Sequence, residues 1–538
     1  MMFSLSKIKA ILSRPQSSIS SASLILAVTF GISAILGFLR SRFLYAHFFQ
    51  CCVLDLDAYN AAFRLPDLIF KLLVTGALSA SFIPVFSSYL HKKPKEAYRL
   101  ASSVINTLFL ILLVAAIIIL IFTRPLSELI ARGFNDYQID LMVNMTRILL
   151  VAQIFFLLSN FLTGILHVRQ NFLIPSLAPI VYNFFIILSI FTLVPAFGIY
   201  GPVYGAVVGA FFHLAIQIPL IRRLGFNYQL TADRHHPGVR EVFRLMLPRS
   251  LALGLGEIEN TVTLFFASTL TAGSISLLNL SLQLMYLPSR IFGTTVGQAS
   301  LPILSKNIAQ NELELFRNTV KKTILRSLYL ALPITALILV NRVGIVRLAF
   351  GAKQFPWSAT LLTAKTLAYL TPAIASQAIV QILIRSFYAL HDTKTPLKIS
   401  AFSLFINILT SYLFINFTDW GILGLAVSAS LSNLVQCFGL FFIFIRRVDG
   451  TGWANTFFRL AQIALLSVVS GVVSWLSIKT LDLFIFDTAR TFSVAIVLGL
   501  ATLIGLFSYI FFSWAFQIKE FSEFKSLFNR ISSIFVSR

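Results

Sequence analysis

Apolar segments of about 20 residues recur along the whole chain, and they restrict its fold more than any other feature. A helix of this length crosses the hydrocarbon core of a bilayer, which is about 30 Å thick. The segments lack the strict alternation of polar and apolar residues that marks membrane β-strands. Only 12% of the residues are charged, about half the usual fraction in a soluble domain. We therefore predict an all-α polytopic membrane protein.

We predict about fourteen transmembrane helices. The first apolar run is too long for a signal peptide, and many more spans follow it. The second and eighth spans exceed what a straight crossing needs, so we expect them to tilt, bend or protrude. The approximate positions are 20–39, 58–89, 100–122, 141–166, 172–194, 198–221, 242–268, 275–304, 323–341, 358–388, 397–416, 421–445, 455–478 and 491–516.

Proline and glycine residues interrupt helix hydrogen bonding in the two long spans. Such residues either bend a helix beside a cavity or let two helices pack closely. The residues concerned are Pro66 and Gly76 in the second span, and Pro288, Gly293 and Gly297 in the eighth.

Basic residues concentrate in alternate loops. About 27 Lys and Arg residues fall in the loops and tails placed inside, against about 9 outside, so both termini are predicted to be cytoplasmic. This distribution accounts for the formal net charge of +23. No nucleic-acid-binding motif supports an RNA or DNA partner. One outside loop, with Arg342, Arg347 and Lys353, runs against the rule.

Three pairs of short motifs recur at a nearly constant separation, which indicates an internal duplication. The paired positions are Pro66 and Pro288, Pro175 and Pro396, and Gly198 and Gly421. We predict two pseudo-symmetric six-helix lobes around a central cavity, as in alternating-access transporters. The predicted organisation is a cytoplasmic segment 1–19, an N-terminal lobe 20–221, a C-terminal lobe 222–445, two further helices in 446–516 and a cytoplasmic tail 517–538.

The chain contains three cysteines, Cys51, Cys52 and Cys437. Neighbouring cysteines rarely bond to each other, and no CxxC metal motif occurs. We therefore expect the cysteines to act as small apolar side chains, without a metal or another cofactor.

Charged residues within the predicted spans indicate a polar site, because they are costly in hydrocarbon and usually line a cavity or form pairs. Arg64, Asp67 and Lys71 follow i, i+3 and i+7 spacing, which places them on one helical face. Asp67 can partly neutralise the two cations, so the predicted site is net positive.

Polar residues of the seventh and eighth spans extend this predicted site. Arg249 lies in the seventh span, with Glu257 two turns further along, and Gln283 and Arg290 lie in the eighth. A cavity lined by Arg and Lys suits a phosphate or diphosphate headgroup, which arginine can bind with two parallel hydrogen bonds. The alternative is an internal salt-bridge network that only locks the helices together.

Several motifs, in order over most of the chain, resemble those of the MurJ (MviN) family of lipid II flippases. The family is part of the multidrug/oligosaccharidyl-lipid/polysaccharide exporter superfamily. The motifs are LGFLR at 36–40, LDAY at 56–59, AFRLPDL at 62–68, GALSASFIP at 76–84, IPSLAP at 174–179, LPS at 287–289, LPILS at 301–305 and DTKTPLK at 392–398.

The resemblance implies export of lipid II, an undecaprenyl-diphosphate-linked disaccharide-pentapeptide, across the bacterial inner membrane for cell-wall synthesis. It implies a transporter without enzymatic activity, whose partners are the lipid substrate, membrane lipids and the cell-wall synthesis or division machinery. In the family, cations of the N-terminal lobe hold the diphosphate, and the last two spans form a groove for the lipid tail.

The family's binding residues are carried over only in part. Arg40 matches the arginine of the LGFxR motif, and Asp57 matches the acid that opens the second span. Three family arginines are replaced by Ala34, Phe70 and Gln283. We hypothesise that nearby cations take over their role. The predicted substrate-binding residues are Arg40, Asp57, Arg64, Asp67, Lys71, Arg249, Gln283 and Arg290.

Three other functions are compatible with parts of the sequence. The first is a flippase for another polyprenyl-diphosphate-linked oligosaccharide, such as an O-antigen unit, because cavity charges alone do not separate these cargoes. The second is a membrane glycosyltransferase using Asp55 and Asp57 as a DxD motif, but this motif falls outside, where nucleotide sugars are absent. The third is a scaffold whose buried charges only fix helix packing.

Overall fold

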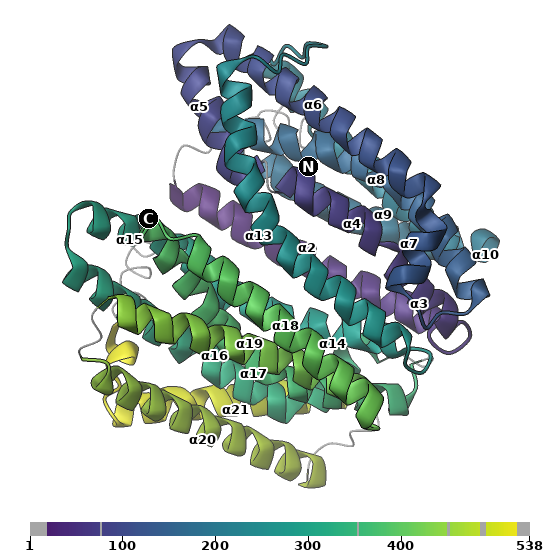
Figure 1. The fold of residues 1–538 in the computed structure, drawn as a ribbon. Coiled ribbons are helices and arrows are strands. Elements are labelled where there is room, and N and C mark those ends of the chain that lie inside the picture. Colours follow the sequence, from purple (N-terminus) through teal and green to yellow (C-terminus); the bar gives the residue numbers. More distant parts are fainter. Residues whose placement is uncertain (1–18, 76–77, 352–354, 449–451, 485–490, 524–538) are drawn as a thin grey trace, which may run out of the picture. The chain divides into compact units, whose positions relative to one another are not determined.

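The computed structural model describes residues 19–75, 78–351, 355–448, 452–484 and 491–523 (Figure 1). These residues form helices joined by short turns, which confirms the predicted all-α class. The chain divides into two compact units, one containing residues up to 276 and the other containing residues 277–351 and 355–538.

The first unit contains helices of very different lengths, because Pro, Gly and π-helical turns interrupt several of them. They are α2 (Ile19–Phe48), α3 (Val53–Ala62), α4 (Arg64–Phe70), η1 (Lys71–Thr75), η2 (Leu78–Phe82), α5 (Ile83–Lys92), α6 (Pro94–Ile121), α7 (Thr123–Ile130), α8 (Asp136–Val168), α9 (Leu173–Thr192), α10 (Val194–Phe197), α11 (Tyr200–Ala215), α12 (Ile218–Arg223) and α13 (Pro237–Ser268).

The second unit contains longer, mostly unbroken helices. Helix α14 (Ser274–Ser289) begins in the first unit and continues into the second. It is followed by η3 (Arg290–Thr295), α15 (Val296–Ala309), α16 (Leu313–Phe350), α17 (Trp357–Ala389), α18 (Lys394–Phe417), α19 (Ile422–Arg447), α20 (Ala454–Phe484) and α21 (Thr491–Ala515).

Ten helices within the described ranges are long and apolar enough to cross a membrane. Where the structure describes them, the remaining four predicted spans are also helical. Two of them, 58–89 and 275–304, are divided by the π-helical turns η1, η2 and η3. A third, 242–268, lies in α13, which carries charged residues along its length. The count of fourteen spans therefore stays a prediction, as do the lobe boundaries at 221/222 and 445/446.

The interruptions expected in the two long spans are present. The turns η1 and η2 follow Pro66, and η3 follows Pro288. Gly76 lies outside the described residues. Close packing also accounts for two glycines of the eighth span, since a Cβ at Gly293 would meet the Ala378 backbone and one at Gly297 the Gln381 carbonyl, each at 3.0 Å. Close packing is thus shown at Gly293 and Gly297, whereas bending beside a cavity stays a prediction.

The core of the second unit forms between α16, α17 and α19. Phe316, Phe387 and Phe444 come one from each of these helices and are fully buried together. Helices α20 and α21 pack against α16, where the Tyr509 hydroxyl donates to the Tyr329 carbonyl at 2.8 Å. The last two spans are therefore attached firmly to α16.

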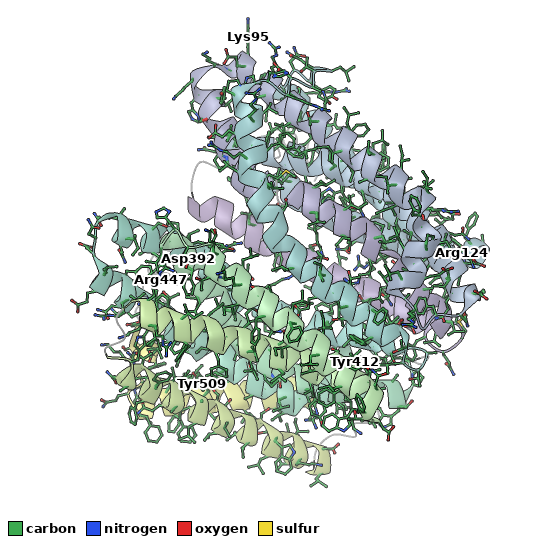
Figure 2. All side chains as sticks on the ribbon, viewed as in Figure 1. Lys95, Arg124, Asp392, Tyr412, Arg447 and Tyr509 are labelled. Carbon is green, nitrogen blue, oxygen red and sulfur yellow. A yellow bond between two sulfur atoms is a disulfide. The ribbon has the colours of Figure 1, made fainter. Side chains whose placement is uncertain are left out.

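The turn between α17 and α18 is held by Asp392, which pairs with Arg447 at the end of α19 (Figure 2). Asp392 also accepts hydrogen bonds from the backbone N–H groups of Lys394 and Thr395, so it caps the start of α18. Burial alone would raise the pKa of the Asp392 carboxyl, but the Thr395 hydrogen bonds and the nearby Arg447 guanidinium bring this pKa below its usual range.

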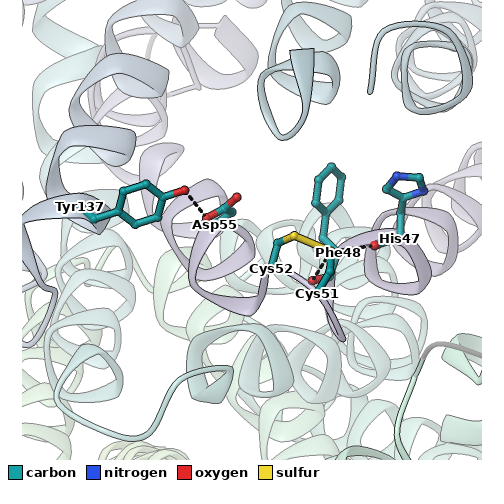
Figure 3. The surroundings of a disulfide bond; sticks show 6 residues. All are labelled: His47, Phe48, Cys51, Cys52, Asp55 and Tyr137. Carbon is teal, nitrogen blue, oxygen red and sulfur yellow. Dashed lines mark hydrogen bonds between the residues drawn. A yellow bond between two sulfur atoms is a disulfide. The ribbon is translucent and has the colours of Figure 1, made fainter. Parts of the chain in front are cut away.

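Cys51 and Cys52 form a disulfide in the turn between α2 and α3 (Figure 3). The expectation that these neighbours would not bond is wrong, because a turn rather than a regular helix holds them, with non-helical backbone at Cys52. Cys437 is a free, buried side chain of α19, as expected. In the described part of the chain, no group of three or more His, Cys, Asp or Glu residues could hold a metal ion.

Replacing Asp392 by Asn should lower stability by about 1–3 kcal/mol near neutral pH, because charge-assisted hydrogen bonds are lost. The folded pKa of Asp392 is depressed, so its contribution is complete above the unfolded pKa of about 3.9 and declines as the pH falls below that value. The difference in melting temperature between wild type and Asp392→Asn should therefore shrink in acid. Asp419→Asn, in the exposed α18–α19 turn, is the control and should change little at any pH. A difference in melting temperature that stays the same at every pH would contradict the stabilising role of the ionised Asp392.

Candidate substrate-binding site

Four of the eight predicted site residues lie on adjoining elements of the first unit. Arg40 is in the C-terminal half of α2, Arg64 and Asp67 are in α4, and Lys71 is the first residue of η1. The chain from Arg64 to Lys71 stays helical, so the predicted stacking of the three charges on one side is retained.

Asp67 is the centre of this charged group. The charges of Lys71, Arg64, Glu257 and Arg40 all act on its carboxylate. We call these five residues the charged cluster. It contains three cations and two carboxylates, so its formal charge is positive.

Glu257 was expected near the site, two turns from Arg249, but not among the substrate-binding residues. The Lys71 ammonium lies 2.9 Å from the Glu257 carboxylate of α13, and the two side chains are 40% and 12% exposed. The only signal in the sequence was that an acid lay within the seventh span. The partner of Lys71 could not be identified, because 186 residues separate the two positions.

Arg40 and Arg64 take part in no ion pair among the residues that the structure describes. The Nε atom of Arg64 is buried and has no hydrogen-bond partner there. A salt-bridge network that only locks helices would satisfy such groups internally. The cluster instead retains guanidinium donors for an anion, and phosphate oxygens match their geometry.

Asp57 has different surroundings. It is 3% exposed, and its two carboxylate oxygens accept hydrogen bonds from the backbone of Gly273 at 2.6 Å and of Ser276 at 2.9 Å. The Ser276 hydroxyl adds a third bond at 2.6 Å. Asp57 therefore caps the start of α14 and fixes the preceding turn against α3. A direct contact between Asp57 and a substrate stays a hypothesis.

Three predicted residues lie elsewhere. Arg249 is on α13, but its side chain falls outside the described part of the structure. Gln283, half-buried on α14, and Arg290, the exposed first residue of η3, belong to the second unit. The structure thus brings together Arg40, Arg64, Asp67 and Lys71, and their binding role stays a prediction.

The chain resembles known proteins over most of its length. A family model described as "Lipid II flippase MurJ" matches residues 52–494. A probable lipid II flippase MurJ of Bdellovibrio bacteriovorus is 26% identical over 504 residues, covering 92% of this chain and 94% of that protein. A lipid II flippase MurJ of Burkholderia cenocepacia is 26% identical over 436 residues, covering 79% and 84%.

Solved structures of membrane transporters also match this chain. A lipid II flippase MurJ in an inward closed conformation matches with a TM-score of 0.75 and 25% identity, covering 92% of this chain and 98% of that one. A multidrug resistance MATE family transporter in an inward-facing conformation matches with a TM-score of 0.63 at 14% identity, covering 80% and 99%. The second match shows a shared fold only.

Replacing Asp57 by Asn should destabilise the protein by about 1–3 kcal/mol, because the amide presents one acceptor oxygen to three donors that stay buried. Thermal unfolding of the purified protein measures the loss. Ser276→Ala removes one of the three bonds and should cost about 1 kcal/mol. Equal stability of Asp57→Asn and wild type would show that the cap contributes nothing.

Proposed function

The chain belongs to the lipid II flippase MurJ family, and from this premise we propose that it moves lipid II from the cytoplasmic to the outer leaflet of the bacterial inner membrane. As a member of a flippase family it is a transporter and not an enzyme. The single observation that supports the proposal most strongly is the family match over residues 52–494. Flippases for an O-antigen unit are not favoured, since the matched relatives are named as lipid II flippases.

The charged cluster supplies the chemistry for binding the diphosphate. Arg40 and Arg64 donate hydrogen bonds to phosphate oxygens, and the buried Nε of Arg64 gains the acceptor it otherwise lacks. Asp67 lies among these cations and partly offsets their charge. The disaccharide and peptide follow the diphosphate, while the polyprenyl chain stays in the lipid.

Transport proceeds by alternating access of two lobes, 20–221 and 222–445, with both chain termini in the cytoplasm. The internal duplication and the asymmetry of basic loops support this arrangement. The membrane potential can drive the return of the positive site, at about 2.3 kcal/mol per charge per 100 mV. Delivery of lipid II to the outer leaflet places the protein beside the cell-wall synthesis machinery, which is the proposed partner.

Complementation tests the function. A host depleted of its own lipid II flippase should survive when it produces this chain. Arg40→Ala and Arg64→Ala should fail to rescue at equal abundance, since hydrogen bonds to charged groups each contribute about 1.5–3 kcal/mol. Arg124→Ala is the matched control, because Arg124 is an exposed arginine of the same unit paired with surface carboxylates.

The outcomes separate the function from the site. Failure of a well-inserted wild type would point to another polyprenyl-linked cargo. Rescue by the Arg40→Ala and Arg64→Ala variants would retain the function and overturn the assignment of the charged cluster.

A further inference from the structure

One face of α13 is docked on the π-helical turn η1. The Ser250 hydroxyl donates to the Leu72 carbonyl at 2.6 Å, and Glu257 pairs with Lys71. Between them, Gly254 faces the Leu72 side chain so closely that a Cβ would lie 3.0 Å from it. Positions 250, 254 and 257 share one helical face, so all three contacts form together or break together.

The backbone of η1 makes this docking possible. A π-helical turn departs from the regular α-helical hydrogen-bond pattern, and Ser250 provides a donor to one of its carbonyl groups. Lys71, at the first position of η1, is 40% exposed and so accessible to a second anion. Glu257 presents oxygen atoms with the same charge sign and hydrogen-bonding capacity as a phosphate. The carboxylate and a phosphate therefore compete for one ammonium group.

We propose that Glu257 is an internal competitor, which occupies Lys71 until the diphosphate of the substrate replaces it, and that this exchange releases α13 from η1. The nature of the substrate rests on the function proposed above. After the exchange, Glu257 is an unpaired carboxylate near Asp67, which is unfavourable in a membrane-spanning segment. Movement of α13 away from η1 relieves that repulsion. Substrate binding is thereby linked to displacement of a membrane-spanning helix.

Binding of farnesyl diphosphate to the purified full-length protein in lipid nanodiscs tests the competition, with uncharged farnesol as the control ligand. Glu257→Gln should bind the diphosphate about 5-fold more tightly or better than wild type, because the competitor is gone. Glu259→Gln, two residues further along α13, is the matched control and should leave the affinity unchanged. Unchanged or weaker binding by Glu257→Gln would overturn the proposal.

The exchanged pair Lys71→Glu/Glu257→Lys separates competition from simple helix locking. This variant restores the ion pair, so it should unfold at the wild-type temperature. It should bind farnesyl diphosphate more weakly than wild type and should fail to transport, because Arg40 and Arg64 remain but the ammonium group has moved off η1. Restored binding and transport would mean that the pair only locks the helices. If the exchanged variant does not fold, the affinity of Glu257→Gln for farnesyl diphosphate is the measurement that tests the competition.

Displacement of α13 has its own measurement. The pair Leu72→Cys and Gly254→Cys, in a protein whose native cysteines are replaced by alanine, should form a disulfide quickly when a mild oxidant is added, and farnesyl diphosphate should slow the reaction. A rate unaffected by the ligand would overturn the release of α13. The protein could fail to rescue the flippase-depleted host and still show tighter diphosphate binding by Glu257→Gln. That result would refute lipid II as the cargo but would support competition by Glu257.

Discussion

Charged groups within a hydrocarbon layer must be paired or face a polar space, and this constraint organises the first unit. Glu257 pairs with Lys71, Asp57 is satisfied by Gly273 and Ser276, and Asp67 lies among cations. Each of these interactions joins segments that are distant in the chain. The positions of α13 and of the turn before α14 against the N-terminal helices therefore depend on polar contacts in addition to apolar packing.

Irregular helix geometry coincides with two of the basic residues predicted to bind substrate. Lys71 opens η1 and Arg290 opens η3, in the two spans that the internal duplication pairs. Non-helical or π-helical backbone at membrane depth is tolerated where protein or a polar cavity satisfies the freed groups. The Ser250 hydroxyl does so for Leu72. A proline in each long span thus marks where backbone irregularity and a basic side chain occur together.

Features set by local sequence were predictable, whereas those set by distant partners were not. The apolar segments predicted the helical class, and the spacing of Arg64, Asp67 and Lys71 predicted their common face. The Lys71–Glu257 pair was not predictable, because no local pattern relates positions 186 residues apart. Asp57 shows the same limit: its match to a family acid suggested a binding role, but its hydrogen-bond donors come from residues 216 and 219 positions away. The Cys51–Cys52 bond depends on turn geometry that spacing alone does not reveal.

Charge balance connects the proposed exchange to transport. With Glu257 in place, the charged cluster has one excess cation, and without Glu257 it has two. In the proposed cycle, two excess cations match a doubly negative diphosphate, so the loaded site would be close to neutral and its outward movement would be little affected by the membrane potential. After release, Glu257 would return to Lys71 and the site would again carry one excess positive charge. An inside-negative potential attracts that charge toward the cytoplasm, at about 2.3 kcal/mol per 100 mV for a full crossing. The same carboxylate would thus delay release of α13 until substrate arrives and limit the charge that the empty site carries back.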